Sequence, residues 1–125
     1  MTLTEFLLAR IAEDEAAAMA AAWDGHSWIP EPCHVARSDT DVCVTTFASD
    51  AVHIARHDPP RVLRECIAKR RIVKIHTEGL DDFDGSELYS TGCDGCNSAL
   101  WPCPTILALS LPYADYPDYL EEWKP

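Results

Sequence analysis

Apolar side chains near the N-terminus recur at the spacing of an α-helix. Five of them fall near one helical face: Leu3, Leu7, Ile11, Ala18 and Ala22. Alanine, which has the highest helix propensity, dominates the second half of this stretch. Thr2 with Glu5 three residues later fits a capping box, and Thr4 is a second possible cap. We therefore expect a long helix that stops near Asp24-Gly25, where glycine suits a C-terminal cap.

Two shorter stretches, 28–35 and 42–46, have the composition of β-strands, and turn-forming residues at 37–41 separate them. The prolines at positions 30 and 32 restrict the first strand to a sheet edge, because proline cannot donate a ladder hydrogen bond. We expect an antiparallel hairpin that packs on the helices, since an isolated hairpin is only marginally stable.

Two helices are predicted next, the first capped by Ser49 or Asp50 and ending at His57. Asp58 is a good N-cap for the second, and the prolines that follow it are tolerated in a first turn. This second helix runs to about His76. Its apolar arc comprises Val62, Leu63, Cys66, Ile67 and Val73, and its outer face carries Arg61, Arg64, Arg71 and Lys74.

The C-terminal part alternates polar and apolar segments. Residues 77–92 are rich in Asp, Glu, Gly and Ser and predict an exposed loop, whereas 104–111 predicts a compact apolar helix that Pro112 ends. The tail predicts a last short helix, capped by Asp115 or Pro117-Asp118, with aromatic side chains on the core.

The expected fold class is α+β, mainly α, as one domain of residues 1–125 with parts 1–76 and 77–125.

One histidine and three cysteines form a candidate metal site in the second part. His76 ends the basic helix, Cys93 and Cys96 form a Cys-x-x-Cys pair, and Cys103 precedes the apolar helix. One imidazole and three thiolates complete a tetrahedral zinc site, and a closed site of this kind is structural. The alternative is that Cys93 and Cys96 are loop thiols and Cys103 is a small buried hydrophobe. A redox role is disfavoured because no strand-to-helix setting is evident.

The other cysteines have simpler interpretations. Cys66 lies on the apolar arc of its helix and is expected in the core. Cys33 and Cys43 lie on the two predicted strands and are expected to face each other as packed thiols. With His26 or His34 they can alternatively form a second metal site, although their spacing does not favour one.

A histidine pair offers the other candidate chemistry. His53 and His57 are one helical turn apart, and Asp58 follows directly, so the three are candidate acid–base residues of an enzyme. The motif lacks the glutamate that follows the first histidine in zinc proteases. A polar helix face on which His57 closes the helix end is the simpler interpretation.

Charge is unevenly distributed along the chain. The net charge is −11, yet residues 51–76 hold seven basic and two acidic side chains between two acidic segments. The overall balance disfavours general binding to nucleic-acid phosphates or anionic membranes. Internal charge complementarity accounts for the basic helix. One alternative is that a partner protein docks on the basic face of this helix. Another is that the acidic surface of the chain mimics DNA.

The expected chemical state of the cysteines indicates the cellular compartment of the protein. No segment is apolar enough to cross a bilayer, and no secretory signal is recognisable at the N-terminus. The six cysteines are therefore expected as thiols or metal ligands, which predicts a cytoplasmic protein.

Two motifs carry a family resemblance. They are HIARHDPPRVLR at residues 53–64, continued by 68–72, and LPYADYPDYLEEW at 111–123, preceded by 101–105. With the N-terminal helix they resemble an uncharacterised family of small proteins from actinobacteria and their phages. Because that family is a domain of unknown function, the resemblance implies no activity, substrate or partner.

The resemblance also bears on the metal site. In members that carry cysteines, the pattern of His, Cys-x-x-Cys and Pro-Cys corresponds to a set of four residues here: His76, Cys93, Cys96 and Cys103. Other members lack these cysteines, so the resemblance does not imply a metal in the whole family. This chain departs by Pro60 where alanine is usual and Tyr116 where histidine is usual, and neither is a proposed ligand.

Together these features predict an interaction or regulatory protein with one structural zinc. This protein would bind either another protein or a second copy of itself. An enzyme that uses His53, His57 and Asp58 is the first alternative. A nucleic-acid binder is the second.

Overall fold

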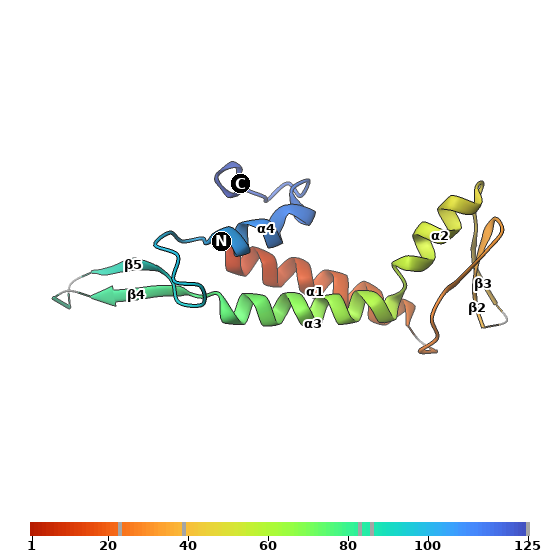
Figure 1. The fold of residues 1–125 in the computed structure, drawn as a ribbon, viewed down its shortest axis with the longest axis horizontal. Helices are drawn as coiled ribbons and strands as arrows, with labels where there is room; N and C mark the ends of the chain where they lie inside the picture. Colours follow the sequence, from red (N-terminus) through yellow and green to blue (C-terminus); the bar gives the residue numbers. More distant parts are fainter. Residues whose placement is uncertain (23, 39, 83, 86, 125) are drawn as a thin grey trace. The chain divides into compact units, whose positions relative to one another are not determined.

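The structure is a computed structural model that describes residues 1–22, 24–38, 40–82, 84–85 and 87–124. Within these residues it contains four α-helices, two 3-10 helices and two small antiparallel sheets, which confirms the mainly helical α+β class (Figure 1). The chain forms two compact units, residues 1–11 with 68–125, and residues 12–67. Helices α1 (Leu3–Ala21) and α3 (Pro59–Ile75) contribute residues to both. The single-domain organisation stays a prediction.

Both long helices begin as their sequences predict. The Thr2 backbone N–H donates to Glu5 Oε2 (2.7 Å), and the Glu5 N–H donates to Thr2 Oγ1 (3.2 Å), which confirms the capping box of α1. The Arg61 N–H donates to Asp58 Oδ1 (3.0 Å), which confirms the cap of α3. In the described part of the chain, no helix has the length and apolarity that crossing a membrane requires.

The apolar arc of α3 is narrower than predicted. Cys66 and Val73 are buried, and Val62 and Leu63 are half-buried. The prediction that Ile67 lies on this arc was wrong, because Ile67 is 50% exposed. The predicted outer face is correct, since all four of its basic residues are exposed: Arg61, Arg64, Arg71 and Lys74.

The unit of residues 1–11 and 68–125 has an aromatic core. Phe6 is fully buried, and the rings of Tyr113, Tyr119 and Trp123 pack around it with centroids 6.4, 5.7 and 5.1 Å away. The Tyr119 hydroxyl also donates to the Trp123 carbonyl oxygen (3.0 Å). These contacts confirm that the aromatic tail packs on the core. Phe6 belongs to α1, so the start of this helix is part of that core.

The rest of this unit follows the end of α3. Its elements are β4 (Glu78–Asp82), β5 (Leu88–Cys93), α4 (Pro104–Ser110) and two 3-10 helices, Leu111–Tyr113 and Glu121–Trp123. Strands β4 and β5 form an antiparallel hairpin, so the prediction of a loop at 77–92 was wrong, although most of the described residues there are exposed as predicted. The last 3-10 helix is preceded by Leu120, so the predicted caps at Asp115 and Pro117-Asp118 were also wrong.

The unit of residues 12–67 contains the second sheet. Its elements are β1 (Ile29–Glu31), β2 (His34–Arg37), β3 (Thr40–Val44) and α2 (Ala48–Arg56). The strand order is β1-β2-β3, with both pairs antiparallel. Val35 from β2 packs with Ala51 and Ala55 from α2 in a buried cluster, and Trp28 packs against it. Helix α2 and the sheet therefore share a small core.

Two predictions in this unit need correction. The predicted strand 28–35 is two strands, because the chain turns at Pro32-Cys33, where Cys33 adopts a positive φ of 62°. Helix α2 begins after Phe47 with no side-chain cap, so Ser49 and Asp50 lie inside its first turn and cap nothing. Residue 39 of the predicted turn lies outside the described residues.

Candidate metal centre

Three structural elements end or begin at the predicted ligands. His76 directly follows α3, and its backbone N–H still donates to the Ile72 carbonyl (3.0 Å). Cys93 is the last residue of β5, and Cys96 follows in the turn. Cys103 is the N-cap residue of α4, where its carbonyl accepts the Leu107 N–H (3.0 Å). The ligands are thus held by the ends of regular elements.

Backbone contacts bring the Cys-x-x-Cys turn onto the end of α3. The Asp94 N–H donates to the Thr77 carbonyl (3.0 Å), and the Cys93 N–H donates to the Ser98 carbonyl (2.8 Å). A Cβ atom at Gly95 would overlap the carbonyl oxygen of Ile75. Only glycine fits at this position without a shift of the backbone. Gly95 therefore lets Cys93 and Cys96 approach His76.

The four donor atoms have the spacing of a metal site. They lie within 4.8 Å of one another, and His76 Nδ1 is 3.5 Å from both Cys93 Sγ and Cys103 Sγ. In a tetrahedral zinc site, a ligand nitrogen and a ligand sulfur are about 3.6 Å apart. A ring nitrogen carries either one proton or one lone pair, so it cannot make two good hydrogen bonds to sulfur. A single metal ion bound between these atoms would account for both distances, and the donor set fits zinc.

Burial and polarity at the centre differ from ligand to ligand. Cys93 and Cys103 are buried, His76 is half-buried and Cys96 is exposed. Burial raises the pKa of Cys93, but hydrogen bonds from His76 and from the backbone of Cys96 and Gly95 outweigh it and lower this pKa to about 7. A thiol with that pKa is partly ionised at neutral pH, and the thiolate is the form that binds a metal.

Cys96 behaves in the opposite way. A backbone hydrogen bond from Ser98 lowers its pKa, but desolvation and the neighbouring sulfurs of Cys93 and Cys103 together raise the pKa of Cys96 above its usual value. Negative charges on neighbouring sulfurs repel one another, so the ionised forms of these thiols are disfavoured when no cation is present. The same crowding of negative charge favours a bound divalent ion.

The three candidate acid–base residues have different surroundings. The ring of His57 packs beside that of His53, with centroids 4.7 Å apart, and its Nδ1 lies 2.8 Å from the His53 carbonyl oxygen. Both histidines are exposed, whereas Asp58 is buried. Asp58 Oδ1 and Oδ2 accept backbone N–H groups of Arg61 (3.0 Å) and Trp28 (3.2 Å). Each carboxylate oxygen of Asp58 therefore already accepts one backbone hydrogen bond.

The cysteines on the three-stranded sheet are not paired. Cys33 is exposed in its turn, and its Sγ lies 3.8 Å from the Thr46 carbonyl oxygen. Cys43 is opposite Val35 in the register, so the prediction of two packed thiols facing each other was wrong. His34 lies 2.8 Å from Glu31 and 3.6 Å from Asp41 rather than beside a cysteine. Among the described residues, the His76 cluster is the one group of three or more ligands this close together.

The fold and this cluster define a small, mainly helical α+β protein with a possible metal site made by one histidine and three cysteines. The chain belongs to a family of unknown function (DUF6221), whose family model matches residues 1–125. No curated protein and no solved structure matches the chain.

Proposed function

We propose that this is a zinc-binding interaction protein, in which one structural zinc holds the C-terminal segment together. The observation that carries the proposal is the convergence of His76, Cys93, Cys96 and Cys103, whose ligand atoms lie within 4.8 Å of one another. The ion would tie the end of α3, the base of the β4–β5 hairpin and the start of α4. Since protein ligands fill all four positions, no open position is left for a substrate or an activated water.

Zinc content, with matched cysteine variants, tests the metal proposal. Cys96 is exposed, so Cys96→Ser removes a ligand with little change in packing, and Cys33→Ser makes the same change at an exposed cysteine elsewhere. We expect about one zinc per chain in the native protein and in Cys33→Ser, since one closed site binds one ion. Cys96→Ser should lose the zinc and unfold at a lower temperature. A native protein that is folded but contains no zinc would contradict the metal proposal.

The interaction part of the proposal rests on the basic residues of α3. Arg64, Arg71 and Lys74 are exposed on a chain whose net charge is −11. Exposed cations on an acidic protein favour a partner with an acidic surface, which includes a second copy of this chain. The cytoplasmic location and the actinobacterial or phage setting belong to the same proposal. They are supported by the cysteine chemistry and by the two motifs at 53–64 and 111–123.

Charge reversal tests the partner surface. The double variant Arg64→Glu, Arg71→Glu should abolish recovery of the partner in a quantitative pull-down, and should abolish any self-association seen by analytical ultracentrifugation. Arg56→Glu reverses an exposed arginine on α2 and is the matched control. Circular dichroism checks that each variant folds. Unchanged recovery and unchanged sedimentation of the double variant would exclude this surface.

A further inference from the structure

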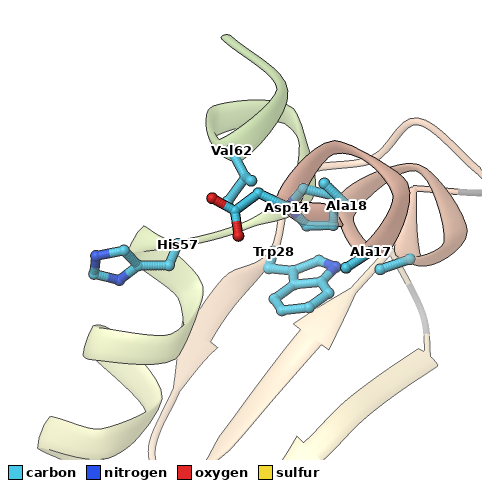
Figure 2. A pocket seen from close by; sticks show the side chains of 8 residues that line it. Asp14, Ala17, Ala18, Trp28, His57 and Val62 are labelled. Carbon is cyan, nitrogen blue, oxygen red and sulfur yellow. The ribbon is translucent and has the colours of Figure 1, made fainter. Parts of the chain in front are cut away.

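A cavity of about 250 Å³ lies within the unit of residues 12–67. Figure 2 shows it between α1, the segment that precedes β1, and the junction of α2 with α3. The labelled side chains that line it are Asp14, Ala17, Ala18, Trp28, His57 and Val62. It shares no residue with the candidate metal centre.

The walls of this cavity are mostly apolar. Ala17 and Ala18 leave space beside α1 because their side chains end at the Cβ atom, and Val62 lies across from them on α3. The Trp28 indole forms a flat aromatic wall (Figure 2). Apolar walls with a few polar groups are the usual composition of a small-molecule site.

Trp28 is held in place from several directions. Its backbone N–H donates to Asp58 Oδ2 (3.2 Å), and its side chain packs against the cluster of Val35, Ala51 and Ala55. Its indole Nε1 is buried and has no hydrogen-bond partner in the described part of the chain. The aromatic wall is therefore formed before any ligand arrives, which lowers the entropic cost of binding.

Asp14 and His57 are the ionisable side chains among the residues that line the cavity. Asp14 is half-buried, and in Figure 2 its carboxylate extends between Trp28 and His57. The His57 imidazole points away from the indole in the same view, and its Nδ1 is close to the His53 carbonyl. Among the described residues that line the cavity, Asp14 alone carries a fixed charge. A carboxylate beside an aromatic face is an arrangement that attracts cations.

We propose that this cavity binds a small organic cation, in which a primary ammonium group meets Asp14 and an apolar body packs on Trp28. The alanine wall and Val62 would contact the apolar body. The volume is slightly below the roughly 300–1,000 Å³ of sites for drug-sized molecules, so the ligand is smaller than those. The proposal is independent of the zinc proposal, because every lining residue belongs to the unit of residues 12–67.

Three probes of similar shape and different charge test the inference: phenethylammonium, phenethyl alcohol and 3-phenylpropionate. Titration is followed by ¹H–¹⁵N correlation spectra of the protein of residues 1–125 as purified. The chain has four tryptophans, so the Trp28 indole signal is assigned by its loss in Trp28→Phe. We expect saturable shifts of that signal with the cation only. Equal binding of all three probes, or no saturable shift with the cation, would overturn the proposal.

Two variants locate the binding. Asp14→Asn should weaken cation binding about three- to tenfold, the range expected for a partly exposed charge pair with an aromatic neighbour. Glu13→Gln removes the neighbouring carboxylate, which does not line the cavity, and should leave binding unchanged. Ala17→Leu, at an exposed position, should fill the cavity and block the probe without loss of fold. Equal effects of Asp14→Asn and Glu13→Gln would show general attraction to an acidic protein and would overturn the site.

Discussion

The Asp58 carboxylate connects two segments that are 30 residues apart in the chain. One oxygen caps α3 through the Arg61 N–H (3.0 Å), and the other accepts the Trp28 N–H (3.2 Å). The cap was predictable, because Asp before Pro-Pro is a strong N-terminal signal. The second bond was not, since it depends on how the chain returns from the sheet. The same bond helps to fix the aromatic wall of the cavity.

Replacement of Asp58 therefore removes two interactions. Asp58→Ala should lower the free energy of unfolding by about 2–4 kcal/mol, from one lost cap and one backbone N–H left without an acceptor. Asp58→Asn keeps an oxygen for the cap and should lose less. Asp50→Ala, at an exposed position in the first turn of α2, is the control. Urea unfolding measures all three, and equal stability of Asp58→Ala and the native protein would contradict the double role.

At the scale of elements, the sequence predicted helices better than strands. The helices carry caps and apolar periodicity that local chemistry explains, as with Thr2 and Glu5 in α1. The β4–β5 hairpin has no such signal, because nearly all of its side chains are exposed and no face alternates with a buried one. A polar stretch of this kind has the composition of a loop. The turn at Cys33 was missed because positive φ is uncommon outside glycine.

The candidate metal centre was predictable for a different reason. Ligand types are few, so one histidine, a Cys-x-x-Cys pair and a further cysteine indicate a zinc site without knowledge of the fold. The sequence did not reveal how the turn reaches α3, because the contact of Gly95 with Ile75 forms only in the folded chain. The cavity beside Asp14 and Trp28 had no sequence signal, since tertiary packing alone brings these residues together.

For the molecule as a whole, all four candidate ligands belong to the unit of residues 1–11 and 68–125. The unit of residues 12–67 has its own buried cluster of Val35, Ala51 and Ala55. A metal stabilises the state that binds it, and its removal is felt first in the segments that the ligands connect. Zinc should therefore affect the two units unequally.

Chelation followed by hydrogen exchange measures this difference. Removal of zinc should increase deuterium uptake in peptides that cover residues 76–103, because the ion no longer ties α3, the hairpin and α4 together. Peptides from the three-stranded sheet and α2 should keep their protection, since their core contains no ligand. Cys96→Ser is the control, because a protein already without zinc should show no further change with chelator. Uniform loss of protection along the chain would instead mean that the two units unfold as one cooperative structure, and the metal would then stabilise the whole fold rather than one part of it.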